Sequence, residues 1–226
     1  ARQLSRVLRM RAGEEIGVFD GSGTEWTIEL DEISSRCVEG HVVDVTRPST
    51  EPRVDITLYQ SLIDAAQFEL VLQKGVELGV KRFIPLFTER VSGAGSTGAS
   101  EGRQARWARI VQEAVEQSGR VFVPEVVAPV AMDAAFADPP TGLLIVPWEG
   151  ETSSSLREVL KTQAAGSHDA ISIVIGPKGG LTAAEIDFLK QCGALPVTLG
   201  SRILRAETAA IATVTMVLYE LGDLEA

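Results

Sequence analysis

The segment with the clearest chemical potential runs Ile175-Gly176-Pro177-Lys178-Gly179-Gly180-Leu181-Thr182. It begins where an apolar run ends, and Thr182 is followed three residues later by Glu185, the pattern of a helix capping box. Ligands of α/β sheets bind at the carboxyl ends of strands, and glycines let a ligand approach the backbone closely. The alternative is a tight strand-to-helix turn that needs positive φ angles. The segment matches neither a P-loop nor a dinucleotide fingerprint.

A second candidate segment, Leu199-Gly200-Ser201-Arg202-Ile203-Leu204-Arg205-Ala206-Glu207-Thr208, follows the next apolar run. Two arginines and a glutamate lie at a strand-to-helix junction there, and the arginine fork suits bidentate recognition of a phosphate or an anionic ring. Surface salt bridges would explain Arg202 and Arg205 equally well. The helix macrodipole alone would favour Glu207 near a helix start.

A literal G-x-G-x-x-G occurs at Gly93-Ala94-Gly95-Ser96-Thr97-Gly98. The pattern indicates a dinucleotide site only where it ends a strand and opens a helix. Poor helix formers, Ala99-Ser100-Glu101-Gly102, follow it here. A flexible loop is therefore the prediction, and a nicotinamide-dependent oxidoreductase is the alternative.

Composition excludes several other functions. With only His41 and His168, and with no Cys or His pair at ligand spacing, we expect neither a metal site nor a Ser-His-Asp triad. No apolar run is long enough for a membrane span, and the first residues do not form a signal peptide. Cys37 and Cys192 are predicted to be buried thiols, which fits a cytoplasmic protein.

The charge balance argues against a general nucleic-acid coat. Twenty-one Lys and Arg stand against 31 Asp and Glu, for a net charge of −10. Basic residues nevertheless gather locally: residues 1–13 contain four arginines and no acid, and Arg103, Arg106 and Arg109 share one helical face. Solvated helix faces are the ordinary explanation for such runs. If RNA is a partner, local arginines must bind it, and non-specific affinity should be weak.

The elements that would position these groups fall into two parts. Residues 14–47 alternate as β-strands with an Asp20-Gly21 hairpin turn, and prolines near residue 50 suggest a linker. From residue 54, strands alternate with helices, which predicts an α/β domain with a buried parallel sheet and helices on both faces. The expected strands are 54–58, 83–87, 126–127, 143–146, 171–175 and 195–198, and the expected helices are 63–79, 103–118 and 206–221. Three loops, 146–150, 176–180 and 199–204, should then converge on one ligand.

The last helix is apolar on almost every side. Ten of the thirteen residues from Ala209 to Leu221 are apolar, so this helix must be covered all round. A central position in the domain or a subunit interface would each achieve this. A homodimer is therefore one of two interpretations of this feature.

The two C-terminal segments together resemble the SPOUT superfamily of knotted RNA methyltransferases, and more narrowly the RsmE family, which methylates N3 of a uridine in 16S ribosomal RNA. Further matches lie along the whole chain: Arg6-Val7-Leu8-Arg9, Phe19-Asp20-Gly21, Lys74, Glu77-Leu78-Gly79, Glu89-Arg90, Arg106-Trp107 and Glu113-Ala114-Val115-Glu116-Gln117-Ser118. The family usually has Glu where this chain has Lys178. The resemblance also leads us to expect that the chain starts inside the family's first domain.

The resemblance implies a PUA-like β-barrel that binds RNA in residues 1–50 and an α/β SPOUT methyltransferase domain in residues 54–226. It implies S-adenosyl-L-methionine held by a deep C-terminal trefoil knot, a homodimer across the knotted region, 16S ribosomal RNA as partner, and no membrane contact. The cofactor would contact Val146, Pro147, Ile175, Gly176, Gly179, Gly180, Leu199, Gly200, Ile203 and Leu204. Arg205, Glu207 and Arg202 would serve catalysis, and Arg6, Arg9, Arg90, Arg106 and Arg120 would bind RNA.

Two alternatives remain from the sequence. A SPOUT enzyme could act on a ribose 2′-hydroxyl or on a tRNA base instead. A non-catalytic RNA-binding protein would use the arginines and leave the glycine segments as structural turns.

Overall fold

A computed structural model describes residues 1, 3–91, 101–163 and 170–224. The predicted loop at residues 93–98 therefore lies outside the described residues. The chain divides into two compact units, one formed by residues 1–51 and 119–123 and the other by residues 52–118 and 124–226. Each unit is described by itself below.

The first unit is an antiparallel sheet of β1 (Glu15–Phe19), β2 (Glu25–Ile33) and β3 (Val38–Thr46), preceded by a π-helical turn at Gln3–Val7. The hairpin at Asp20-Gly21 is confirmed: Phe19 pairs with Glu25 across it. Gly21 has φ +85°, a conformation that favours glycine. In its described residues the unit is an open three-stranded sheet and not the closed barrel that the family resemblance implied.

A segment from the middle of the chain completes this unit. Residues 119–123 join it through an antiparallel bridge between Ser22 and Phe122. The Arg120 side chain is only 3% exposed, and its Nε and Nη2 donate to the Glu51 carboxylate at 3.0 and 2.5 Å. The family resemblance implies that Arg120 binds RNA. Its burial against a carboxylate gives it a structural role in this conformation instead.

Replacing Arg120 with alanine should lower the free energy of unfolding by roughly 2–3 kcal/mol, because it leaves the Glu51 carboxylate without its buried partner. Glu51 is one-third exposed, so water offsets part of the loss. Urea denaturation measures the change. Arg109→Ala is the matched control, since Arg109 forms an exposed pair with Glu113 at 3.4 Å and should cost less than about 0.5 kcal/mol. Equal losses in both variants would contradict this assignment.

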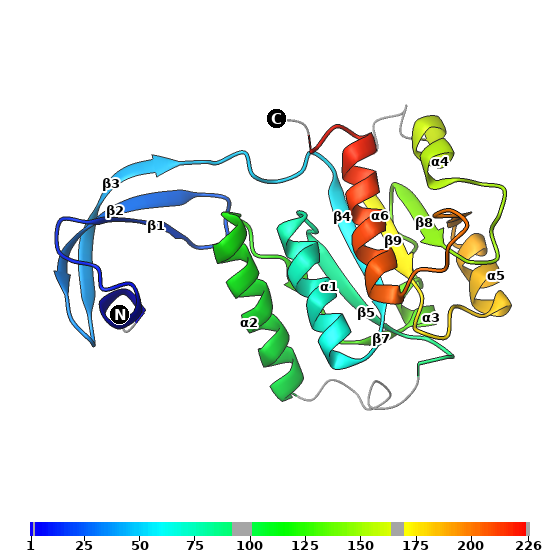
Figure 1. Cartoon of the computed structure of the whole chain (residues 1–226), viewed down its shortest axis with the longest axis horizontal. Helices are drawn as coiled ribbons and strands as arrows, with labels where there is room; N and C mark the ends of the chain where they lie inside the picture. The colour runs from blue at the N-terminus through cyan, green and yellow to red at the C-terminus, as the bar shows by residue number, and fades with distance from the viewer. Residues whose placement is uncertain (2, 92–100, 164–169, 225–226) are drawn as a thin grey trace. The chain divides into compact units, whose positions relative to one another are not determined.

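The second unit is built on a parallel sheet in the order β10-β8-β9-β4-β5-β6, with β7 also paired to β5 (Figure 1). The strands are β4 (Asp55–Ser61), β5 (Arg82–Phe87), β6 (Glu125–Val126), β7 (Val130–Ala131), β8 (Leu143–Pro147), β9 (Ala170–Ile175) and β10 (Leu195–Val197). The central strands are buried on both faces, as their continuous apolar runs predicted. Their carboxyl ends therefore meet at one edge.

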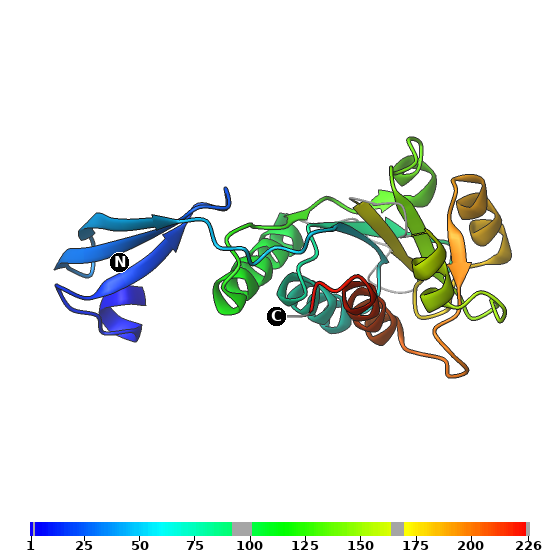
Figure 2. The same ribbon diagram turned by 90° about the horizontal axis from the view of Figure 1, so that it is seen from above.

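Helices cover both faces of this sheet, which confirms the predicted α/β architecture (Figure 2). The helices are α1 (Ala65–Glu77), α2 (Glu101–Ser118), α3 (Met132–Ala135), α4 (Leu156–Gln163), α5 (Ala183–Gln191) and α6 (Ala206–Glu220). On one face α1 packs against α2 and α6, with the Phe68 and Trp107 rings 4.6 Å apart. On the other face α3 and α5 cover a core that includes Tyr59, Leu144 and Val174.

Helix α6 has a buried side and an exposed side. Ala210, Val214 and Val217 are buried, and the helix contacts α1, β4 and β9. Met216 is 38% exposed and Tyr219 68% exposed. The single chain therefore covers only part of the apolar surface that the sequence places on this helix.

Two further observations concern expectations from composition. No helix among the described residues is long and apolar enough to cross a membrane. The prediction of two buried thiols is wrong for Cys37, which is exposed near the end of a hairpin, while Cys192 is half-buried.

Candidate active site

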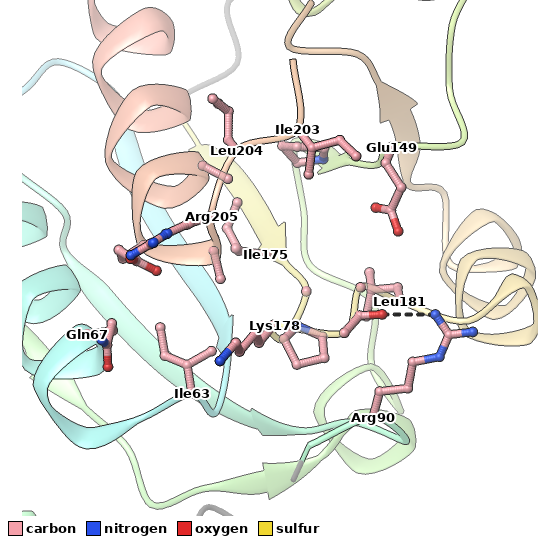
Figure 3. Close-up of a pocket in the computed structure, with 18 of the residues that line it drawn as sticks. Ile63, Gln67, Arg90, Glu149, Ile175, Lys178, Leu181, Ile203, Leu204 and Arg205 are labelled. Carbon is pink, nitrogen blue, oxygen red and sulfur yellow. Dashed lines mark hydrogen bonds between the residues drawn. The ribbon is translucent and has the colours of Figure 1, made fainter. Parts of the chain in front are cut away.

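A cavity of about 530 Å³ opens at the carboxyl edge of the parallel sheet (Figure 3). The loops after β8 and β9 line it, together with the connection from β10 to α6. This is the convergence that the three apolar runs predicted. A fourth wall, formed by Leu62, Ile63 and Asp64 between β4 and α1 and by Gln67 at the start of α1, was not predicted.

A second cavity of about 450 Å³ lies beside the first. It is lined by the β8–α4 loop and by the segment from Thr198 to Leu204. The two cavities share a wall, whose residues are Pro147, Glu149, Ile203, Leu204 and Ala209. The site is therefore a pair of adjoining chambers, which suits a reaction between two bound molecules.

Most of the predicted site residues line one chamber or the other. The first chamber contains Pro147, Ile175, Gly176, Gly179, Gly180, Ile203, Leu204, Arg205, Glu207 and Arg90. The second contains Leu199, Gly200 and Arg202 and shares Pro147, Ile203 and Leu204. Val146 lies in neither lining, because its side chain is fully buried in the core beneath the site.

The glycines of the loop after β9 lie close to side chains of neighbouring loops. Gly180 has φ +72°, and the Glu149 carboxylate occupies the place where a Cβ of residue 180 would lie. A Cβ on Gly179 would lie 3.3 Å from Cβ of Arg90. The loop backbone thus lies close to two side chains from neighbouring loops, and the positive φ of Gly180 favours glycine at that position.

The helix that follows this loop begins with the predicted capping box. Thr182 Oγ1 accepts from the Glu185 amide at 3.2 Å, and Glu185 Oε2 accepts from the Thr182 amide at 2.8 Å. The other Glu185 oxygen accepts from the Glu89 amide at 2.8 Å. One carboxylate therefore starts α5 and also fixes the loop after β5.

Glu185→Gln should lower the free energy of unfolding by about 1–3 kcal/mol, because one of the two amides that face the carboxylate would meet an N–H₂ donor instead of an acceptor. Thermal unfolding measures the shift. Asp187→Asn on the same helix is the control: the Asp187 carboxylate has no hydrogen-bond partner among the described residues, and its replacement should change stability by less than about 0.5 kcal/mol. A Glu185 variant as stable as the control would contradict the double role.

Charged groups surround the first chamber. Arg90, Lys178 and Arg205 line it together with Asp64, Glu149 and Glu207. Among the described residues, Lys178 and Arg205 have no ion-pair or hydrogen-bond partner. Gln67 Oε1 is buried and also lacks a partner, and an unpaired buried acceptor is costly until a donor reaches it. The chamber thus presents cations and an acceptor that a bound molecule can satisfy.

The rim of the second chamber contains a carboxylate that is firmly ionised. Hydrogen bonds from the Ser153 hydroxyl, and from the Ser154 and Ser153 amides, lower the pKa of Glu151 to about 2. These bonds fold the loop after β8 back on itself. The loop between β8 and α4 is therefore held in one conformation by its own hydrogen bonds.

The remaining predicted RNA contacts lie outside the chambers. Arg6 and Arg9 are exposed in the first unit, and Arg9 has the unusual φ of +54°. Arg106 in the second unit pairs with Glu69, where Nη2 donates to Oε2 at 2.7 Å. Trp107, the next residue on this helix, is 3% exposed and packs against Phe68.

Comparison with known proteins gives a consistent result. A family model described as an RNA methyltransferase domain matches residues 50–218, and one described as an RNA methyltransferase PUA domain matches residues 4–40. The chain is similar to ribosomal RNA small subunit methyltransferase E of Synechocystis sp., with 34% identity over 91% of the chain and 66% of that relative. It is 29% identical to the Bacillus subtilis protein of the same name, over 95% of the chain and 85% of that relative.

A solved structure supports the same comparison. The crystal structure of ribosomal RNA small subunit methyltransferase E from Neisseria gonorrhoeae, bound to S-adenosyl methionine, matches with a TM-score of 0.85 and 32% identity. The match covers 96% of this chain and 87% of that one. It therefore extends over both units of the chain.

Proposed function

Because the chain belongs to the ribosomal RNA small subunit methyltransferase E (RsmE) family, we propose that it transfers the methyl group of S-adenosyl-L-methionine to N3 of a uridine in 16S ribosomal RNA. One structural observation supports this proposal in addition to membership of the family. The loops after β8, β9 and β10 converge on two adjoining chambers, with Arg205 and Glu207 at the edge of the first.

The residues present fit the cofactor. Pro147, Ile203 and Leu204 offer an apolar wall for an adenine ring, and the side-chain-free loop at Gly179 and Gly180 exposes backbone groups to polar atoms. Bound S-adenosyl-L-methionine supplies a methyl group already activated on a sulfonium. What the protein must add is alignment of that methyl group with the acceptor, which can contribute a large part of the rate.

The acceptor nitrogen sets the remaining requirement. Uracil N3 carries a proton at neutral pH, and it attacks the methyl carbon only with a free electron pair. We assign Arg205 to stabilise the negative charge that develops on the uracil oxygens, and Glu207 to accept the N3 proton. With the proton on Glu207, the N3 electron pair would be free to accept the activated methyl group that the cofactor would supply, with S-adenosylhomocysteine as the product. Arg202, at the second chamber, would hold a flanking phosphate.

The C-terminal trefoil knot is also part of the proposal. Strand β10 lies at one edge of the sheet beside β8, whereas α6 packs near the centre on α1, β4 and β9. The connection through Arg202 and Leu204 must therefore pass back across the ends of β8 and β9. That crossing supports a knotted path, which is rare among folds.

The exposed side of α6 supports a homodimer. Met216 and Tyr219 on this helix, and Ile203 on the preceding loop, expose large apolar side chains in the single chain, with Ile203 89% exposed. A second copy would cover this surface and adjoin the first chamber. We further propose that Arg6, Arg9, Arg90 and Arg106 contact RNA, within naked 16S RNA or the assembled small subunit, and that the protein acts in the cytoplasm.

Mapping of modified nucleosides in 16S ribosomal RNA from cells that lack this protein tests the function. Mass spectrometry should show the loss of one N3-methyluridine and no other change. Loss of a ribose methyl group or of a tRNA modification would show that the enzyme methylates a different acceptor. A non-catalytic RNA-binding protein would leave every modification in place and show no thermal shift with S-adenosylhomocysteine.

A further inference from the structure

The loop after β5 is hydrogen-bonded to the glycine loop after β9 and to the first turn of α5. The Glu89 amide donates to Glu185 at the start of α5, at 2.8 Å. Arg90 Nη1 donates to the Gly179 carbonyl at 2.9 Å, the dashed line in Figure 3. The residues joined lie 96 and 89 positions apart in the chain, so this contact belongs to the tertiary fold.

Arg90 is held at one end of its guanidinium only. Its stem packs against Gly179, with Cβ and Cδ at 3.3 and 3.5 Å from where a Cβ of residue 179 would lie. A guanidinium has five N–H donors, and the carbonyl bond uses one. The side chain is exposed and has no carboxylate partner among the described residues. Its remaining donors are therefore available to an anion.

We propose that Arg90 is a positioning residue that couples RNA binding to the shape of the cofactor loop: an RNA phosphate pairs with its outer donors while Nη1 holds the Gly179 carbonyl. The proposal rests on the proposed function. Arginine suits this double task because its planar fork binds two partners in fixed geometry. A lysine has one point charge at the end of a flexible stem.

The physical basis is shared ordering. The free Arg90 side chain loses conformational freedom when it holds Gly179. A phosphate that fixes the guanidinium removes this freedom in advance, so the cofactor that binds next meets an ordered loop. Linkage requires the reverse as well: cofactor must strengthen RNA binding by the same factor. In Figure 3 the Lys178 amine extends away from Arg90 across the chamber, so Arg90 is the cation that contacts this side of the loop.

The test measures the affinity of the full-length protein for S-adenosylhomocysteine by calorimetry, with and without a 16S ribosomal RNA transcript. The wild-type protein should bind the nucleoside at least about fivefold more tightly with RNA, the lower end of typical coupling. Arg90→Ala should bind it more weakly and lose the RNA effect. Arg90→Lys should keep much of the RNA affinity, through its charge, and lose the coupling. Arg109→Ala, which removes an exposed arginine on α2, should keep the coupling.

Each other outcome overturns the proposal. No RNA effect in the wild-type protein would remove the coupling itself. If RNA still strengthens nucleoside binding in Arg90→Ala, the coupling does not depend on Arg90. A loss of nucleoside affinity that is equal with and without RNA would make Arg90 a partner of the cofactor alone. Failure of the proposed function is distinguishable, because a wild-type protein that binds no S-adenosylhomocysteine fails before any variant is compared.

Discussion

Arg205→Ala should lower kcat for uridine methylation about 100- to 1000-fold and leave the affinity for S-adenosylhomocysteine unchanged, the scale expected when a preorganised stabiliser of developing charge is removed. Arg205 is the N-cap residue of α6, lines the first chamber, and has no partner among the described residues. Its guanidinium is therefore free to meet the acceptor. Single-turnover methylation measures the rate, and calorimetry measures the affinity.

The pH dependence separates a charge role from a structural one. Higher pH ionises N3 without help, so the rate of the variant should approach that of the wild-type protein as pH rises. Arg157→Ala on α4 is the control, since it removes an exposed arginine that pairs with Glu220 at 3.5 Å and lines neither chamber. It should methylate at the wild-type rate. A full rate in Arg205→Ala, or a rate deficit that is constant with pH, would contradict the assigned role.

Gly180→Val should raise the dissociation constant of the cofactor about 10- to 100-fold. A β-branched residue at φ +72° is strained, and its side chain would displace the Glu149 carboxylate. The loop would relax to another conformation, and its return to the binding shape costs about 1–3 kcal/mol. Each 1.4 kcal/mol is a factor of ten in affinity. Calorimetry with S-adenosylhomocysteine measures the change.

Gly193→Val separates loop shape from general strain. Gly193 has φ +89° after α5, and a Cβ there would meet nothing within 4 Å. It lines neither chamber. Both variants should lose similar stability, but Gly193→Val should bind the cofactor normally. If the two variants bind equally well, the fit of the glycine loop to the cofactor is not the reason for Gly180.

Features set by neighbouring residues could be predicted from the sequence. The Asp20-Gly21 hairpin, the capping box at Thr182 and the extent of α6 depend on local backbone preferences and hydrogen bonds, and the structure confirms all three. The continuous apolar runs of β8 and β9 are also a local feature of the sequence, and they correctly indicated strands buried in a parallel sheet. These local features were sufficient to predict that three of the four cavity walls lie at the same edge of the sheet.

Features set by distant pairing could not be predicted. The fourth wall, at Ile63 and Gln67, lies at the start of α1, whose position the sequence predicted to within two residues. What the sequence did not show is that this helix start faces the loops after β8 and β9, which are about a hundred positions away in the chain. Residues 119–123 join the first unit through pairing with Ser22, about a hundred positions away. Arg120 was mistaken for a surface residue because nothing in its neighbourhood indicates that Glu51 lies opposite.

The central claim is that one uridine nitrogen in 16S ribosomal RNA receives the methyl group. The most direct measurement incubates the purified protein with small ribosomal subunits from cells that lack it, using S-adenosyl-L-methionine with an isotope-labelled methyl group. Mass spectrometry of the digested RNA should find the label at N3 of a single uridine. Label on a ribose, on another base or at many uridines, or no label at all, would contradict the account.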